Sequence, residues 1–464
     1  MPGFDPGWSL AAVVEAVRSG RTTAACIARA ALDANAQNAG LAAVVGFDAD
    51  DVLRQADALD RARSAGEALG AMLGVPLVVK DNIHVAGLPN AAGTKSLASL
   101  VPVADASVVA RLRAAGALVV AKTNMHELAM GWTGQNPHFG STLNPHDPDH
   151  MAGGSSGGTA AALAAGMALA GLGTDTNGSI RIPAAFCGVA GLRPTHGELS
   201  MDGITPLAPS LDTVGPMART VADLAVIYQV LADRLVPPQV DVARIRLAVV
   251  PDYFLADLSQ ETRRAFIAIC DRLRRLGASL IEIELPELAE LVAGSVPAII
   301  GYESHAALTD YLAEYRPGLS IEVLAGYVGA DLRNALRPPD PGAGQACMWA
   351  LQRRERLRAR LGATFAEHRI DAFFHPTTPM PAPLLQLGAL VSPAPDVIVD
   401  GASTPARTAF ARNGSPASLA GLPSLTLPVA GESGLPLGLQ LDGWIGSDAR
   451  LLAIGRAVEA AIEN

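Results

Sequence analysis

Serine hydroxyls in two glycine-rich segments are the clearest candidates for chemistry in this sequence. The first segment is Gly-Gly-Ser-Ser-Gly-Gly-Thr at 153–159, and Ser179 follows in Gly-Ser-Ile-Arg, 24 positions (179 − 155) after Ser155. A third segment, Lys80-Asp81-Asn82, comes directly after an apolar run. Glycine–serine clusters are common in loops, so each segment alone indicates little. Together they place serine hydroxyls and a lysine in one chain, and a lysine can activate a serine only when it is neutral.

Two familiar motifs compete for the glycine-rich segment. Residues 153–157 formally fit the G-x-S-x-G nucleophile elbow, which would make Ser155 the nucleophile of an α/β-hydrolase. That fold requires a strand immediately before the motif, whereas Asn-Pro-His-Asp-Pro-Asp-His-Met at 144–151 is typical of a loop. A phosphate-binding loop is not favoured either, because no G-K-[ST] follows the glycines.

The elements that would position these residues alternate between apolar strands and helices. Strands expected at 74–80 and 118–122 are apolar throughout, which is typical of strands covered on both faces. Ser9 and Thr22 are candidate N-caps of two short helices in the first 40 residues. Further strands are expected to end at Thr174 and to span 245–250, 280–285, 372–375, 424–429 and 437–441; helices are expected at 106–115, 159–168, 221–231, 259–276 and 448–462.

This alternation predicts a single large α/β/α domain over residues 1–464, with a mixed central sheet covered by helices. No internal repeat or long linker divides the sequence. A mostly helical stretch at about 286–368 interrupts the alternation. We expect it to form an insert that serves as a lid or as a wall of the substrate pocket.

Composition excludes several classes of protein. The net charge of −10 (35 basic and 45 acidic residues) argues against nucleic-acid binding. The four cysteines lie far apart without a CxxC pair, so zinc knuckles, redox motifs and a disulfide framework are not expected. The start of the sequence does not resemble a signal peptide, and the most apolar run, 160–173, is too short for a membrane span. A soluble cytoplasmic protein is expected.

Several blocks, in the same order, resemble those of amidase-signature hydrolases over most of the chain. The blocks are 79–83, 125–129, 152–195, 419–423 and 434–440, with the core of the signature at about 74–216. The C-terminal blocks 441–443 and 446–455, together with 203–207 and 211–216, are more similar to indoleacetamide and mandelamide hydrolases than to the glutaminase subunit of the transfer-RNA-dependent amidotransferase. That subunit is the alternative reading of the chain.

The resemblance implies a catalytic triad of two serines and a lysine. Ser179 matches the nucleophile, and Ser155 matches a bridging serine that follows a cis peptide bond. Lys80, at the end of its strand, matches the base. Burial among apolar neighbours lowers the pKa of a lysine, which agrees with that role. Neither a metal nor an organic cofactor is implied.

The residues around the predicted nucleophile match an oxyanion hole. The backbone N–H groups of Thr176, Asn177, Gly178 and Ser179 would stabilise the charge on the attacked carbonyl oxygen. The position of Asn177 is usually glycine in the family, and asparagine tolerates left-handed backbone angles better than most residues. This departure puts the leaving-group preference in doubt.

Other residues have a structural and a functional reading. Arg181 is expected to pair with Asp175, with binding of a substrate carboxylate as the alternative. Cys187 is expected to be a small buried side chain, and the histidines 138, 146 and 150 to be solvated or capping residues without zinc-ligand spacing. Within the loop that borders the acyl pocket in the family, the candidate substrate contacts are Met130, Gly131, Trp132 and Gln135.

The sequence therefore predicts a serine amidohydrolase that forms an acyl-enzyme with a small, aryl or hydrophobic amide. Anilides, esters and carbamates present a carbonyl to the same nucleophile and are further candidate substrates. Activity is expected to rise toward alkaline pH as Lys80 loses its proton. A homodimer is expected from the resemblance.

Overall fold

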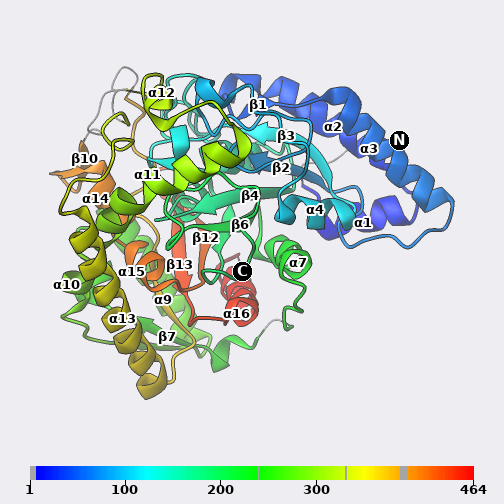
Figure 1. The fold of residues 1–464 in the computed structure, drawn as a ribbon. Coiled ribbons are helices and arrows are strands. Elements are labelled where there is room, and N and C mark those ends of the chain that lie inside the picture. Colours follow the sequence, from blue (N-terminus) through cyan, green and yellow to red (C-terminus); the bar gives the residue numbers. More distant parts are fainter. Residues whose placement is uncertain (1–6, 239, 330–331, 387–395, 464) are drawn as a thin grey trace.

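The computed structural model describes residues 7–238, 240–329, 332–386 and 396–463, and is built around one eleven-stranded sheet (Figure 1). In spatial order the strands are β1 (Val44–Gly46), β3 (Leu118–Thr123), β2 (Pro76–Lys80), β4 (Ala170–Asp175), β6 (Thr213–Ala218), β5 (Ala190–Arg193), β12 (Ser424–Ala430), β13 (Pro436–Asp442), β9 (Ala372–Pro376), β7 (Arg246–Val249) and β8 (Ser279–Glu282). A separate hairpin joins β10 (Asp396–Val399) to β11 (Ala402–Pro405).

The sheet is mixed, which confirms the predicted fold class. Strand β2 runs parallel to both β3 and β4, and β7 runs parallel to both β8 and β9. The strands between these two groups pair antiparallel. Strands β2, β3 and β4 are buried along their whole length, as expected for strands with helices on both faces.

Helices cover both faces of the sheet. On one face α7 (Val221–Ala232) packs against β5 and β6, and α16 (Asp448–Glu463) packs against α7 and β12. On the other face α5 (Gly157–Ala164) and α6 (Arg181–Cys187) pack against each other, α5 on β2 and β4 and α6 on β5, β12 and β13. The remaining helices of the core are α4 (Ser107–Ala114), α8 (Pro251–Phe254), α9 (Gln260–Arg275), α14 (Ala406–Ala411) and α15 (Ser415–Ala420).

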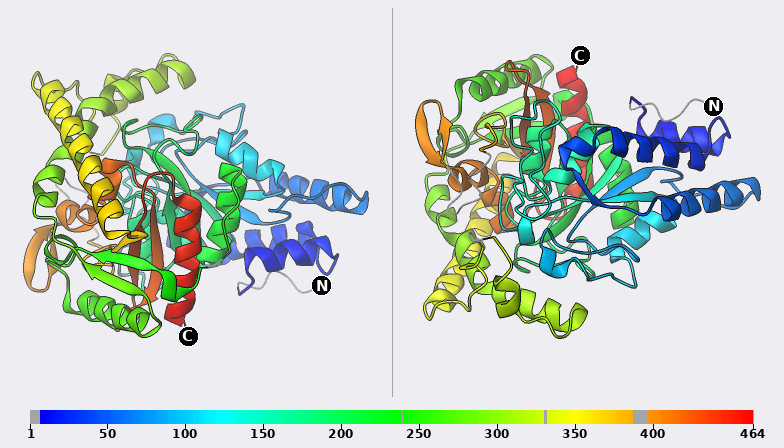
Figure 2. Two further views of the ribbon diagram at one scale, coloured as in Figure 1. Left: turned by 90° about the horizontal axis from the view of Figure 1, so that it is seen from below. Right: turned by 90° about the horizontal axis from the view of Figure 1, so that it is seen from above.

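The two ends of the molecule are helical. At one end lie α1 (Leu10–Arg18), α2 (Ala24–Gln37) and α3 (Ala49–Ser64), and at the other end lies the predicted insert (Figure 2). The insert contains α10 (Leu288–Val292), α11 (Ser295–Tyr315), α12 (Ile321–Ala325) and α13 (Ala343–His368). Its helical character is confirmed, and α11 and α13 pack along each other.

Some elements differ from the sequence-based expectations for identifiable reasons. Helix α3 is not expected from the sequence because seven of its 16 residues are charged and interrupt the apolar pattern; within it only Val52 and Ala56 are buried. Strand β6 contains Gly215 and Pro216, which are poor strand residues. A Cβ at Gly215 would lie 2.1 Å from the carbonyl oxygen of Leu192, so glycine is required for the close approach of β5. Thr23, rather than Thr22, caps α2.

The structure also bears on the membrane expectation. Within the described part of the chain, no helix combines the length and the apolar character that a bilayer span requires. The division into a single domain stays a prediction.

Candidate active site

Lys80 is the last residue of β2, in the middle of the parallel part of the sheet. Its side chain is fully buried, and Nζ lies 2.7 Å from Ser155 Oγ and 2.7 Å from Thr174 Oγ1. A third, longer contact of 3.4 Å reaches the carbonyl oxygen of Thr174. Because β4 runs beside β2, Thr174 lies next to the end of β2 and its hydroxyl meets the lysine amine.

Burial changes the protonation of this lysine. Loss of solvation lowers the pKa of Lys80 to about 7, although the negative charges of Asp175 and Asp212 oppose the shift. An ordinary lysine is almost entirely protonated at neutral pH. With a pKa of about 7, roughly half of the Lys80 side chains are neutral there and can accept a proton.

Ser155 lies in the short loop that precedes α5, and its side chain is fully buried. The peptide bond between Gly154 and Ser155 is cis, as the resemblance implies. The carbonyl oxygen of Ser155 accepts a hydrogen bond from His126 N–H. The next residue, Ser156, donates its N–H to the carbonyl oxygen of Ser179 (3.1 Å) and its hydroxyl to that of Thr174 (3.2 Å). These bonds place the loop between the end of β4 and the turn that carries Ser179.

The turn that carries Ser179 connects β4 to α6 and is organised by the carboxylate of Asp175. Both oxygens of Asp175 bind the Arg181 guanidinium, at 3.0 Å each, and Oδ1 also binds Arg193 at 3.1 Å. All three side chains are completely buried. Burial alone would raise the pKa of Asp175, but the two guanidiniums outweigh burial and hold this pKa well below its usual range. The structural reading of Arg181 is therefore confirmed.

The backbone N–H groups of this turn divide into two sets. Gly178 (φ 103°) and Ile180 donate their N–H groups to Asp175, at 2.7 and 3.1 Å. Among the described residues, the N–H groups of Thr176, Asn177 and Ser179 make no hydrogen bond. The Gly178 N–H is thus occupied in this structure, and the other three predicted oxyanion donors are unoccupied. The oxyanion role of all four stays a prediction.

Asn177 does not use the left-handed angle that the sequence allowed for. It is absent from the positive-φ residues of the described chain, and the glycine beside it supplies the left-handed position. The Asn177 side chain points to α15, where Oδ1 lies 3.2 Å from Ser415 Oγ. The amide therefore joins the turn to α15.

Comparison with known proteins agrees with this arrangement. The family model described as Amidase matches residues 21–452. The chain belongs to the amidase family. A mandelamide hydrolase of Pseudomonas putida is 37% identical over 96% of this chain and 90% of its own length, and an indoleacetamide hydrolase of Rhizobium radiobacter is 37% identical over 91% and 90%. A crystal structure of an amidase has a TM-score of 0.86 and 36% identity, covering 98% of this chain and all of the other.

The candidate substrate loop of this amidase-family chain packs directly on the loop that carries Ser155. A Cβ at Gly154 would lie 2.8 Å from the N of Gly134 and 3.2 Å from the carbonyl oxygen of Gly131, so the two loops are in contact. Trp132 donates its indole N–H to the carbonyl oxygen of Asn177 at 3.1 Å. Its ring packs in a cluster with Met151, Ile182, Phe186, Met380 and Phe410.

The other two candidates in this loop have different surroundings. Met130 packs with Met125, Ala129, Leu207 and with Ile300 of α11, so the insert contacts the loop. Gln135 is buried, and its side-chain amide donates to the carbonyl oxygen of Gln386 at 3.0 Å. Met130 and Gln135 thus contact other residues of the chain. The roles of Met130, Gly131, Trp132 and Gln135 in substrate binding stay predictions.

Two polar residues next to the predicted triad were missed by the sequence reasoning. Thr174 binds Lys80, and its position one residue before the Asp-Thr-Asn-Gly-Ser turn is the signal that could have identified it. Asp212 is buried and accepts the hydroxyl of Thr176 at 2.6 Å. In the sequence, Asp212 stands out only as part of the block 211–216 that resembles other amidases. Nothing in the sequence shows that residues 176 and 212 meet across β4 and β6.

The remaining chemical candidates lie outside this cluster of groups. Cys187 is fully buried, and burial raises the pKa of its thiol, which confirms the reading as a small apolar side chain. His138 binds Glu127 at 2.8 Å, His146 lies 3.0 Å from the carbonyl oxygen of Cys187, and His150 binds Asp147 at 3.0 Å. These three histidines bind three different partners. The segment before Ser155 is a loop, which disfavours the nucleophile-elbow reading.

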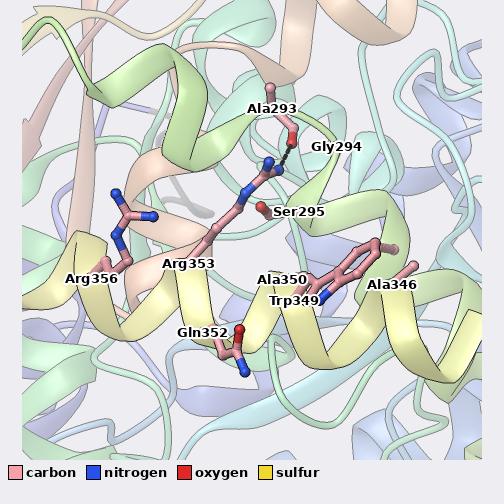
Figure 3. A pocket seen from close by; sticks show the side chains of 10 residues that line it. Ala293, Gly294, Ser295, Ala346, Trp349, Ala350, Gln352, Arg353 and Arg356 are labelled. Atoms are coloured by element: carbon pink, nitrogen blue, oxygen red, sulfur yellow. Dashed lines mark hydrogen bonds between the residues drawn. The ribbon is translucent and has the colours of Figure 1, made fainter.

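A groove of about 300 Å³ lies elsewhere, on the surface of the insert (Figure 3). It runs between α13 and the residues that join α10 to α11, and Arg353 crosses it to donate to the carbonyl oxygen of Ala293 (3.0 Å). The residues that line it are Ala293, Gly294, Ser295, Ala298, Ala346, Trp349, Ala350, Gln352, Arg353 and Arg356. None of these lining residues belongs to the serine–lysine cluster, so the groove is a separate feature.

Proposed function

We propose that this amidase-family chain hydrolyses the C–N bond of a small amide through an acyl-enzyme on Ser179. The observation that carries the proposal is the 2.7 Å contact between the buried amine of Lys80 and the hydroxyl of Ser155. A lysine with a pKa of about 7 can remove a proton from that hydroxyl at neutral pH. Ser156 N–H binds the carbonyl of Ser179, which holds the second hydroxyl in the neighbouring turn.

The proposed reaction has two halves that use the same relay. Ser179 Oγ attacks the substrate carbonyl carbon, its proton passes to Ser155 Oγ, and the Ser155 proton passes to neutral Lys80 Nζ. The C–N bond then breaks, and the amine leaves with a proton returned along the relay. Water next attacks the acyl-enzyme and gives its proton to the relay. The carboxylic acid leaves, and Ser179 regains its proton.

The negative oxygen formed in each half needs hydrogen-bond donors. We assign this role to the N–H groups of Thr176, Asn177 and Ser179, because Gly178 N–H is already bonded to Asp175. Removal of one oxyanion donor costs roughly 3 kcal/mol of transition-state stabilisation in comparable sites. The buried Asp175–Arg181–Arg193 group holds the turn rigid, so the donors need no reorganisation during the reaction.

The proposed substrate is an amide with a hydrophobic or aryl acyl group. Two apolar clusters flank the nucleophile turn, one around Trp132 and Ile182 and the other around Met130 and Leu207. The names of the similar hydrolases, mandelamide and indoleacetamide, both describe aryl-bearing primary amides. Anilides, esters and carbamates remain candidates at the same site, because each presents a carbonyl to the same hydroxyl.

The alternative function is that of a glutaminase-type subunit in a transfer-RNA-dependent amidotransferase. That function would use the same three residues but requires partner subunits and a polar acyl group. The apolar residues beside the turn favour the aryl amide. The cytoplasmic location and the homodimer stay predictions from the sequence.

Labelling with a fluorophosphonate, followed by peptide mapping, tests the proposal. We expect an adduct on the peptide that carries Ser179 and no adduct in the Ser179→Ala variant. Turnover of phenylacetamide-type amides should disappear in the same variant. An adduct on Ser155 would contradict the assignment and favour the nucleophile elbow. Turnover of glutamine in preference to aryl amides would favour the amidotransferase subunit.

A further inference from the structure

Asp212 is a buried carboxylate directly behind the candidate oxyanion turn. It lies just before β6, and its side chain is 5% exposed. Oδ1 accepts the hydroxyl of Thr176 at 2.6 Å, and Oδ2 accepts the N–H groups of Leu207 and Ala208 at 2.8 and 2.9 Å. Every partner donates to the carboxylate, so its hydrogen bonds suit the ionised form.

The bond to Thr176 matters because of where Thr176 sits. Thr176 is the first residue after β4, and its N–H is one of the three of this turn that make no hydrogen bond to any residue the structure describes. A hydroxyl held by a carboxylate fixes the rotation of the threonine side chain about Cα–Cβ and so restrains the backbone that carries it. The loop before β6 that carries Asp212 is held in place as well. The carbonyl oxygen of Thr205 in this loop accepts a hydrogen bond from Asn82, two residues after Lys80.

We propose that Asp212 is a positioning residue of the reaction, which holds the Thr176 N–H in place through the Thr176 hydroxyl and supplies negative charge near Lys80. The inference rests on the proposed function, since it assigns a role within the same site. Asp212 would not touch the substrate. Its effect on the oxyanion would pass through Thr176, and its effect on the base would pass through space.

The charges around Lys80 determine how far Asp212 can influence the base. Asp175 and Asp212 both raise the pKa of Lys80 and so oppose the larger effect of burial. The charge of Asp175 is compensated by Arg181 and Arg193 at about 3 Å. On the other side of β2, Asp81 lies 3.9 Å from Lys122, the buried cation of β3. Asp212 lacks such a direct ion pair within the described residues. Burial raises the pKa of Asp212, and the hydrogen bonds from Thr176, Leu207 and Ala208, together with the charge of Arg193, oppose that shift.

The two roles predict different results for substitutions at Thr176 and at Asp212. Thr176→Val removes the hydroxyl but keeps the Asp212 charge, so kcat should fall roughly 10- to 100-fold, less than the loss of a whole oxyanion donor. The KM should change little, and the titration of Lys80 should stay where it is. Thr176→Ser restores the hydroxyl and should restore kcat to within about threefold. Asp212→Asn should lower kcat and also lower the pKa of Lys80, because it removes a negative charge that raises that pKa.

The chain offers a direct measurement of that pKa, because its lysines are Lys80, Lys95 and Lys122 alone. Carbon-13 NMR of protein labelled at the lysine Cε positions gives three signals to follow with pH, and Lys95→Met assigns the exposed one. The Lys80 signal should titrate at lower pH in Asp212→Asn than in wild type. If that signal does not move, or if Thr176→Val keeps wild-type kcat, the inference is wrong.

The same experiments separate this inference from the proposed function. If turnover in the wild type does not depend on Ser179, so that Ser179→Ala keeps it, both the proposed function and this inference are wrong. Normal turnover with an unchanged Lys80 titration in Asp212→Asn would overturn the inference alone. If Asp212→Asn does not fold, the comparison of Thr176→Val with Thr176→Ser decides, since an equal loss of kcat in both variants contradicts a role for the hydroxyl.

Discussion

The indole N–H of Trp132 donates to the carbonyl oxygen of Asn177 at 3.1 Å. This bond joins the candidate substrate loop to the turn that carries Ser179, two residues away. The same peptide unit carries the C=O that Trp132 binds and the N–H of Gly178 that Asp175 binds. Both sides of that peptide are therefore fixed, one by the substrate loop and the other by the buried ion pair.

The first prediction concerns Trp132. Phenylalanine at this position keeps an aromatic ring in the apolar cluster but cannot donate to Asn177, and a hydrogen bond of this kind is worth about 1 kcal/mol. We expect kcat for an aryl amide to fall roughly fivefold in Trp132→Phe. Trp444→Phe is the control, because Trp444 packs against Phe365 at a distance from the turn and should leave kcat unchanged. Equal effects of the two substitutions on steady-state kinetics would contradict the prediction.

The second prediction concerns the pH dependence of the reaction. Because the pKa of Lys80 is lowered to about 7, the fraction of neutral base rises with pH, and kcat/KM should rise through a midpoint near pH 7 and then level off. Lys80→Met should reduce kcat by roughly 10²- to 10⁴-fold and remove this midpoint. Lys95→Met changes an exposed lysine and should keep the wild-type profile. A profile that is flat from pH 6 to 10 in the wild type would exclude a lysine base.

The third prediction concerns the Asp175–Arg181 pair. Arg181→Met leaves a buried carboxylate with one cation instead of two, and breaking a buried pair typically costs about 3–5 kcal/mol of unfolding free energy. Arg181→Lys keeps a charge but loses the two-pronged contact, so its cost should be smaller. Urea denaturation measures both. A loss below about 1 kcal/mol in Arg181→Met would show that the pair does not stabilise the turn.

The same pair predicts how stability depends on acid. The pKa of Asp175 is lower in the folded protein than in the unfolded chain, so its contribution is present above the unfolded pKa and is lost as pH falls through the folded one. Removal of Arg181 should raise the pKa of Asp175 in the folded protein, so its contribution to stability should be lost at higher pH. Acid unfolding followed by circular dichroism should therefore begin at higher pH in Arg181→Met. An unchanged onset would contradict this assignment.

The fourth prediction concerns the contact between the substrate loop and the Ser155 loop. Gly134 has φ 76°, and a Cβ there would lie 2.5 Å from the carbonyl oxygen of Gly153. Gly140 has a similar φ of 82° but open surroundings, with a side-chain atom at 3.8 Å as its nearest neighbour. Gly140→Ala should cost about 1 kcal/mol of stability for the backbone angle alone. Gly134→Ala should cost more and should also lower kcat, which thermal unfolding and steady-state kinetics measure.

The sequence predicted the parts of the site that are local in the chain. A buried strand ending in Lys80 and a turn ending in Ser179 are patterns of a few residues, and the pairing of Arg181 with Asp175 spans six positions, from the end of β4 to the start of α6. The structure brings the Ser155 hydroxyl to the Lys80 amine and pairs Arg181 with Asp175. The catalytic roles of the three residues stay predictions that the experiments above address.

Contacts between distant segments could not be predicted. Asp212 reaches Thr176 because β6 runs antiparallel to β4, and this pairing is hidden in a strand that contains glycine and proline. Gly178 was assigned as an oxyanion donor because the sequence does not show which N–H groups Asp175 occupies. Helix α3 was missed because charged residues interrupt its apolar pattern, and its packing against α2 comes from a narrow buried face.

The bonds from Arg181 to the far end of the chain have a consequence for how the protein is made. Arg181 donates to the carbonyl oxygen of Gly414 and to the hydroxyl of Ser418, and the sheet between β5 and β9 is closed by β12 and β13. During synthesis, the predicted catalytic residues leave the ribosome more than 200 positions before these partners. The nascent chain therefore lacks the bonds that complete the Ser179 turn until residue 418 has left the ribosome, and a shorter chain should be unable to hydrolyse amides.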